Sequence, residues 1–202
     1  MKLYFSPGAC SLASHIALQE TGLPFEIDRF IASTGKTAGG EDFLQINPKG
    51  YVPTIRMDDG GVLTEGGAVL QYIADRNPAS GLAPEAGTME RYRLQEWLTF
   101  IGTEIHKTFT PLFSKTVSAE VKDRGFDLLT RRFGYVENQL AHSPYLMGDH
   151  FTVADAYMFV VLRWSAPVGF DLTPFPRIRE YMERISARPG VQAAMKAEGL
   201  IQ

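Results

Sequence analysis

The stretch KLYFSPGACSLASHIALQETGLPFEIDRFI, residues 2–31, contains the pattern that decides the fold. Its first residues, KLYFS (2–6), have the aromatic and apolar character of a short strand. CSLASHIALQETG (10–22) has apolar residues at helical spacing and ends at Gly22, a natural helix terminator. FEIDRFI (25–31) then alternates as a second strand does. Strand, helix and strand in this order predict a parallel pair joined by a crossover helix.

The sequence that follows extends this unit. GEDFLQINP (40–48) indicates a short helix or turn that is closed by its proline. VPTIRM (52–57) and VLTE (62–65) flank the turn DDGG, which is a hairpin signal. GGAVLQYIADRN (66–77) has the spacing of a third helix. Together these segments predict a βαβαββα unit over residues 1–77.

The segment PASGLAPEAGT, residues 78–88, contains two prolines and two glycines and few bulky side chains, so it reads as a linker. Beyond it, from Met89 to the end, helical periodicity dominates and strand signals are absent. We therefore expect an α/β domain over 1–77, a linker over 78–88 and an all-helical domain over 89–202.

The composition restricts the possible partners and compartment. The 202 residues are 45% hydrophobic and 21% charged, with a net charge of -3 and no basic run, which argues against nucleic acid and anionic membranes. No apolar stretch approaches the roughly 20 residues that cross a bilayer. The first residues lack the apolar core of a signal peptide, and a single cysteine cannot build internal disulfides. These features favour the reducing cytoplasm.

The only cysteine, Cys10, follows the first predicted strand and opens the first predicted helix. Free N–H groups and the helix dipole at such a position favour an anion, which lowers the pKa of a thiol. The alternative is that Cys10 is a small buried hydrophobic residue, the usual state of a free cysteine. No second cysteine stands nearby to resolve a disulfide, so any disulfide formed by Cys10 needs a small thiol from solution.

Two further positions suggest a ligand site. Pro53 interrupts a strand-like run, which indicates an edge, a bulge or a cis turn. Glu65 precedes the helix that begins at Gly66, so its carboxylate could bind the ammonium of a ligand while helix N–H groups bind the carboxylate of that ligand. The simpler interpretation of Glu65 is an acidic residue that favours a helix start.

The first long helix of the second half carries two stripes. The apolar stripe predicts core and consists of Leu94, Trp97, Leu98, Ile101 and Ile105. The other stripe is uncharged, polar and mostly short, and we interpret it as lining a cleft; it consists of Gln95, Thr99, Gly102, Thr103, His106 and Thr110.

Two other features are structural rather than chemical. Thr152 and Asp155 have the spacing of a capping box, with Phe151 placed to form a hydrophobic staple. The histidines other than His106 show no metal-ligand spacing with Cys10, so we expect no metal site.

Several motifs together resemble the glutathione transferases, most closely the bacterial beta class. The motifs are MKLYFSPGACSL, INPKGYVPTI, LTEGGAVLQYIAD, RYRLQEWLTFIGTEIHK, GDHFTVADAY and EGLI, and they span almost the whole chain. The resemblance implies a thioredoxin-like first domain that binds glutathione as co-substrate, a helical second domain that forms the electrophile site, and a homodimer.

The resemblance also implies roles for residues of the first domain. Cys10 would face the glutathione sulfur and form a mixed disulfide with it, and Ser11 would offer a hydroxyl close to that sulfur. Val52, before a cis Pro53, would pair its backbone with the cysteinyl part of glutathione. Glu65 and Gly66 would hold the γ-glutamyl end.

In the second domain the motif TEIHK carries the implied roles. The counterpart of His106 in this class reaches the thiol site. Thr103 and Glu104 would join the glutathione site, with Glu104 acting across a dimer interface if the chain pairs in that way.

This chain departs from the beta-class pattern at several positions. Phe5 stands where tyrosine is common, and Thr99 where asparagine is frequent. Gly66 replaces a frequent serine, and the lysine that often contacts glutathione is shifted to Lys36, behind Gly35. These differences would weaken glutathione binding.

The leading hypothesis is an enzyme that transfers glutathione to small electrophiles, with thiol–disulfide exchange or peroxide reduction through Cys10 as a second activity. An alternative is a non-catalytic stress protein that keeps the fold and binds glutathione or hydrophobic compounds. A third hypothesis, a dithiol glutaredoxin-like reductase, conflicts with the absence of a second cysteine. The sequence does not name the electrophile.

Overall fold

The computed structural model describes residues 1–202, which form two compact units. The first unit combines Met1–Ala83 with Arg188–Gln202, and the second is Pro84–Ala187. The boundary after Ala83 falls inside the segment 78–88. The C-terminal residues from Arg188 onward pack with the first unit, whereas their helical pattern had placed them in the second domain.

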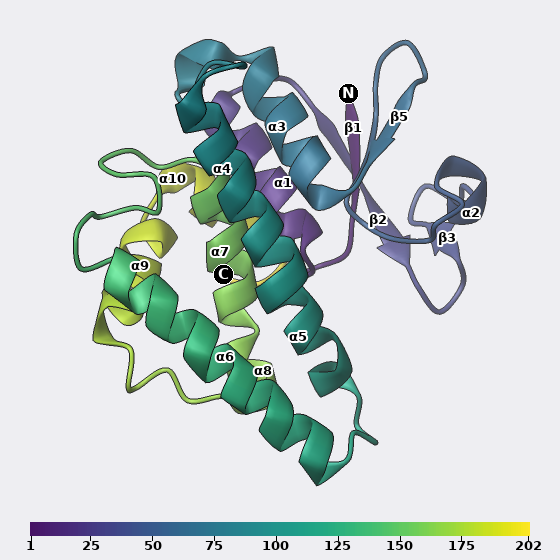
Figure 1. Cartoon of the computed structure of the whole chain (residues 1–202). Helices are drawn as coiled ribbons and strands as arrows, with labels where there is room; N and C mark the ends of the chain where they lie inside the picture. The colour runs from purple at the N-terminus through teal and green to yellow at the C-terminus, as the bar shows by residue number, and fades with distance from the viewer. The chain divides into compact units, whose positions relative to one another are not determined.

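The first unit contains a mixed sheet with helices against it. Its elements are β1 (Lys2–Phe5), α1 (Ser11–Thr21), β2 (Glu26–Ile31), β3 (Lys36–Thr37), α2 (Phe43–Ile46), β4 (Thr54–Arg56), β5 (Val62–Thr64), α3 (Gly66–Arg76), η1 (Pro78–Ser80) and α10 (Pro189–Ala197). Within this unit α1 lies beside α3, and α2 lies near β3 at the end of β2 (Figure 1).

The strand order is β3-β2-β1-β4-β5. β1 and β2 are parallel, with Lys2 opposite Glu26, which confirms the predicted crossover. β4 runs antiparallel to β1, and β4 and β5 form the predicted hairpin. The two-residue strand β3 is an addition that the sequence pattern did not indicate. The predicted thioredoxin-like unit followed by helices is therefore confirmed.

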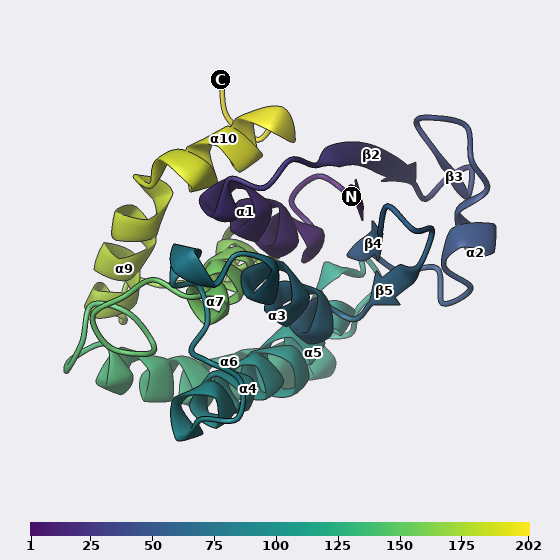
Figure 2. The same cartoon turned by 90° about the horizontal axis from the view of Figure 1, so that it is seen from above.

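The two faces of β1 are covered by different helices. The ring of Phe5 lies 6.0 Å from that of His15 on α1, while the ring of Tyr4 lies 5.9 Å from that of Phe43 on α2. This is the alternation of a strand, with Tyr4 and Phe5 pointing to opposite faces. α1 also packs against α3 and α10, so it forms the centre of the helical layer of this unit (Figure 2).

The second unit is helical, as predicted. Its elements are α4 (Met89–Phe100), the π-helical segment η2 (Ile101–His106), α5 (Lys107–Phe109), η3 (Thr110–Phe113), α6 (Ala119–Gln139), α7 (Val153–Arg163), α8 (Ser165–Val168) and α9 (Pro176–Ser186). The apolar stripe predicted as core is buried along its whole length, from Leu94 to Ile105. α7 begins at the predicted capping box. No helix combines the length and the apolar character that crossing a membrane requires.

Candidate active site

Cys10 occupies the N-cap position of α1, where the sequence placed it. Its side chain is half-buried, and its thiol donates a hydrogen bond to the carbonyl oxygen of Val52, with Sγ 3.2 Å from that oxygen. The Val52–Pro53 peptide bond is cis. The helix start favours a thiolate at this position, whereas the bond to the carbonyl favours the neutral thiol, so the sulfur lies between two opposing influences.

The loop before Cys10 is held by residues from the other end of the chain. The carboxylate of Glu198 accepts a hydrogen bond from the backbone N–H of Gly8 at 2.9 Å and lies 3.0 Å from Nδ1 of His15. The side chains of His15 and Glu198 are 1% and 0% exposed. No local sequence pattern indicates this pair, although Glu198 lies in the terminal EGLI motif and His15 in the first helix.

The hydroxyl of Ser11 makes two hydrogen bonds in the turn before Cys10. Its hydroxyl is fully buried, accepts from the N–H of Ser6 at 3.1 Å and donates to the carbonyl of Ser6 at 3.3 Å. The hydrogen bonds of Ser11 therefore fix the turn before Cys10, and neither of them goes to the sulfur of Cys10.

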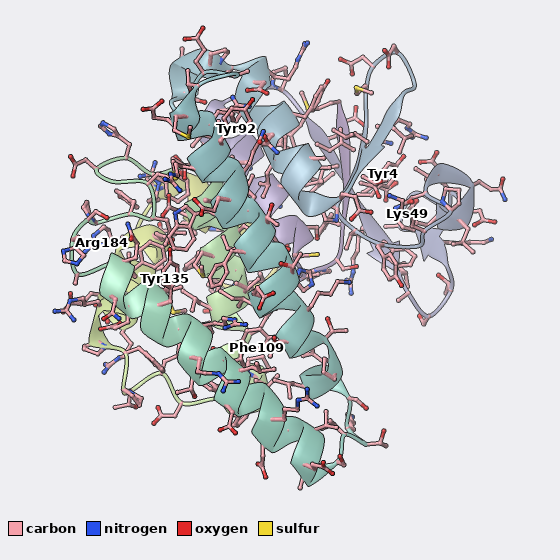
Figure 3. The ribbon with its side chains drawn as sticks, in the orientation of Figure 1. Tyr4, Lys49, Tyr92, Phe109, Tyr135 and Arg184 are labelled. Atoms are coloured by element: carbon pink, nitrogen blue, oxygen red, sulfur yellow. The ribbon has the colours of Figure 1, made fainter.

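Glu65 and Gly66 lie at the start of α3, as predicted. Glu65 has φ of 70°, a conformation that residues other than glycine seldom adopt, and its side chain is exposed. The ammonium of Lys49 lies 2.7 Å from Oε1 of Glu65 and 3.0 Å from Oγ1 of Thr64. The loop position of Lys49 is visible in Figure 3. The motif INPKGYVPTI contains Lys49, but its contact with Glu65 requires the folded hairpin.

The shifted lysine has a backbone explanation. Gly35 has φ of 69°, a left-handed turn conformation that favours glycine over lysine. Lys36 follows on the exposed edge strand β3, where its backbone pairs with Ile31.

The second unit gathers Thr103, Glu104 and His106 on η2. π-helical turns are rare and often occur at functional sites. The side chain of Thr103 donates to the carbonyl of Thr99 at 2.9 Å. The Glu104 carboxylate accepts from the guanidinium of Arg132 on α6, with the Nε–Oε2 distance 3.0 Å. Arg132 was not singled out by the sequence.

His106 lies in an aromatic enclosure. Its Nδ1 is 2.6 Å from the hydroxyl of Tyr157 on α7, and its ring centroid is 4.8 Å from that of Trp164, with the rings edge to face. Burial lowers the pKa of His106 to about 4, and the positive charge of Lys107 adds to this effect. The imidazole is therefore neutral at pH 7.

A cleft of about 300 Å³ opens between α4 and α6. Its lining combines aromatic and charged side chains: Glu96, Trp97, Phe100, Arg131, Arg132 and Tyr135. The rings of Trp97 and Tyr135 are 5.6 Å apart, and Tyr135 is labelled on α6 in Figure 3. This cleft is not lined by the polar stripe that we had interpreted as a cleft wall.

Comparison with known proteins assigns both units to one family. Residues 8–76 match the glutathione S-transferase N-terminal domain, and residues 100–189 match the glutathione S-transferase C-terminal domain. The chain is 43% identical to the glutathione S-transferase GstA of Escherichia coli O157:H7, over 99% of this chain and 100% of the relative.

Solved structures give the same assignment. A sphingomonad glutathione S-transferase complexed with glutathione is 48% identical to this chain, with a TM-score of 0.96. The match covers 100% of each chain. The bacterial beta class glutathione S-transferase of Sphingomonas chungbukensis is 47% identical, with a TM-score of 0.95 and 100% coverage of each chain.

Proposed function

The chain belongs to the glutathione S-transferase family, and from this premise we propose that it conjugates glutathione to small electrophiles. The similarity to beta-class structures and to a relative complexed with glutathione supports glutathione as the co-substrate. In this proposal residues 1–77 bind glutathione, and the helical domain, 89–202, contributes the wall that receives the electrophile. The resulting activity is detoxification in a reducing compartment such as the cytoplasm.

The observation that carries the proposal is the position of the Cys10 sulfur, 3.2 Å from the carbonyl oxygen of Val52. A peptide that pairs its backbone with Val52 brings its own cysteinyl sulfur next to Cys10. Glu65 and the N–H groups at the start of α3 would then receive the charged γ-glutamyl end, as the ammonium of Lys49 already pairs with Glu65. Thr103, Glu104 and His106 would complete the site.

We also propose thiol–disulfide exchange through Cys10. The Cys10 thiolate attacks one sulfur of oxidised glutathione, forms a mixed disulfide and releases one glutathione thiolate. With the disulfide of another thiol as substrate, the same attack forms a disulfide between Cys10 and one half of the substrate and releases the other half as a thiolate. A glutathione thiolate then attacks the substrate sulfur of this disulfide, releases the Cys10 thiolate and leaves as the mixed disulfide of glutathione and the substrate thiol. The chain has one cysteine, so no internal thiol can replace this second step.

The cleft between α4 and α6 supports a homodimer. Its aromatic floor is flanked by Arg131 and Glu96, charges of both signs, which suits contact between two identical surfaces related by a two-fold axis. Tyr135 is 55% exposed there, and such an aromatic side chain favours an interface because aromatic residues are enriched at protein–protein interfaces. We therefore propose that a second copy of this chain covers the cleft.

The intact mass of the purified protein, with and without reductant, tests the Cys10 assignment. Incubation with oxidised glutathione should add one glutathionyl group that reductant removes, and Cys10→Ala should show no adduct. Cys10→Ala should also lose disulfide exchange, while conjugation persists in part because bound glutathione brings its own sulfur. Exchange rates equal to the parent would show that Cys10 is a structural filler.

A panel of electrophiles assayed with the same preparations separates the enzyme from a binding protein. Conjugation above the uncatalysed rate supports the transferase. Glutathione binding without conjugation of any electrophile would favour the non-catalytic ligand-binding alternative.

A further inference from the structure

The imidazole ring of His106 in the second unit is held by two neighbouring side chains, Tyr157 and Trp164. The imidazole lies between the hydroxyl of Tyr157, 2.6 Å from Nδ1, and the edge-to-face ring of Trp164. Tyr157 is 6% exposed and belongs to α7, a helix that is buried along most of its length. A short contact from a buried helix to the π-helical segment leaves the ring little freedom to turn.

The hydrogen bond between these two groups has a preferred direction. A neutral imidazole has one N–H donor and one acceptor nitrogen. Tyrosine, with an ordinary pKa of about 10, is a far stronger acid than the N–H of neutral imidazole, so the phenol donates and Nδ1 accepts. An accepting Nδ1 has no hydrogen, and the remaining hydrogen must be on Nε2.

We propose that Tyr157 is a positioning residue that fixes His106 in the Nε2–H tautomer, so that His106 acts on bound glutathione as a hydrogen-bond donor and not as a general base. The part of this inference that concerns glutathione rests on the proposed function. The tautomer itself rests only on contacts within the second unit.

The chemical consequence concerns the thiol proton. An Nε2–H group can stabilise a sulfur anion by donating a hydrogen bond to it, but it has no lone pair to accept the thiol proton. In conjugation the proton of glutathione therefore leaves to water, the sulfur lone pair forms the bond to the electrophile, and His106 stays neutral throughout.

Nitrogen-15 NMR of protein labelled at histidine tests the tautomer directly. The chain has four histidines, and a His106→Gln spectrum assigns the signal of His106. At pH 7 the parent should show a protonated Nε2 and an unprotonated Nδ1. Tyr157→Phe should shift both nitrogens toward the average of two exchanging tautomers, while Tyr145→Phe, which removes a hydroxyl elsewhere in this unit, should not. An Nδ1–H tautomer or an imidazolium in the parent would overturn the proposal, as would an unchanged spectrum in Tyr157→Phe.

Steady-state conjugation tests the functional half. Tyr157→Phe should lower kcat by about twofold to tenfold with little change in the KM for glutathione, because it affects the orientation of a donor and not the binding of the peptide. Combined with His106→Gln it should add no further loss. A full additive loss would show that Tyr157 acts independently of His106. If His106→Gln leaves kcat unchanged, the placement of His106 in the glutathione site fails, whereas the NMR result still decides the tautomer.

Discussion

Gly66 stands at the first position of α3, where the beta-class resemblance implies a serine. A Cβ built on Gly66 would lie 3.9 Å from Cγ of Pro53, an ordinary contact, so the position has room for a side chain. Gly66→Ser should add a hydroxyl donor for the γ-glutamyl carboxylate and tighten glutathione binding by about threefold to tenfold. Isothermal titration calorimetry measures this change.

Gly134→Ser is the matched control. Gly134 lies in α6 with nothing within 4 Å of its built Cβ, so the substitution gives a similar helix-propensity gain of about 0.5 kcal/mol without a contact to the site. The dissociation constant of glutathione should stay at the parent value in this variant. A parent-like constant in Gly66→Ser as well would show that position 66 does not contact the ligand.

His106 should make the stability of the fold depend on pH in the acid range. Its pKa is about 4 in the folded chain because of burial, against about 6.5 when unfolded, so between these values the unfolded state binds the extra proton. The stabilising contribution is thus complete above pH 6.5 and is lost as the pH falls toward 4, by about 3 kcal/mol.

Urea denaturation of the parent and His106→Gln at pH 7 and pH 4.5 measures this term as a difference. The comparison is needed because burial raises the pKa of Asp155, which changes stability with pH in the opposite direction in both proteins. The parent should lose more unfolding free energy than His106→Gln. Parallel losses in the two proteins would contradict the burial argument.

At the scale of elements, the start of α7 is held by one buried carboxylate. Asp155 accepts from the backbone N–H of Thr152 at 2.8 Å, from the N–H of Leu146 at 2.9 Å and from the hydroxyl of Tyr181 at 2.9 Å. Asp155→Ala should cost about 3 kcal/mol, because it leaves buried donors without an acceptor. Tyr181→Phe should cost about 1 kcal/mol. Chemical denaturation followed by circular dichroism gives both values.

The exposed cap of α6 provides the comparison. Ser118 accepts a hydrogen bond from the N–H of Val121 at 3.3 Å, and Ser118→Ala should cost no more than about 1 kcal/mol. If Asp155→Ala and Ser118→Ala lowered the free energy of unfolding by the same amount, burial would add no stability to the capping box.

Elements with a local signature could be predicted from the sequence. The crossover helix after KLYFS, the hairpin at DDGG and the capping box at Thr152 each depend on residues a few positions apart. The strand β3 has only two residues, too few for a period to be read. The π-helical turn at Ile101–His106 also has no local signature, because its apolar spacing fits an α-helix equally well.

The site was predictable only in part for the same reason. Cys10, Pro53 and Glu65 stand in motifs that can be read directly, but the contact of Cys10 with the carbonyl of Val52 appears only in the structure. Glu198, Lys49 and Arg132 act through contacts with residues that are distant in sequence or on another element. A single sequence does not contain that pairing information, so only the fold could show it.

At the scale of the whole molecule, the proposed homodimer depends on the cleft between α4 and α6. Tyr135→Lys introduces a positive charge beside Arg131 and Arg132 at that surface, and it should convert the dimer to a monomer at micromolar concentration. Glu180→Lys, a similar change at an exposed position of α9, should leave the dimer intact. Light scattering after size exclusion distinguishes the two. A parent that is monomeric would refute the dimer, and a dimeric Tyr135→Lys variant would place its interface elsewhere.

The first unit is discontinuous, and this affects the order in which the protein can be completed during synthesis. The carboxylate that holds the loop of the reactive thiol belongs to Glu198, and α10 and the residues after it pack with a unit that begins at Met1. Chains are made at about 5 to 20 residues per second and usually fold from the N-terminus. Here the second, uninterrupted unit has been fully translated before the ribosome reaches Arg188. The nascent N-terminal segment must therefore wait until Glu198 has been made, and Cys10 reaches its final surroundings only after that.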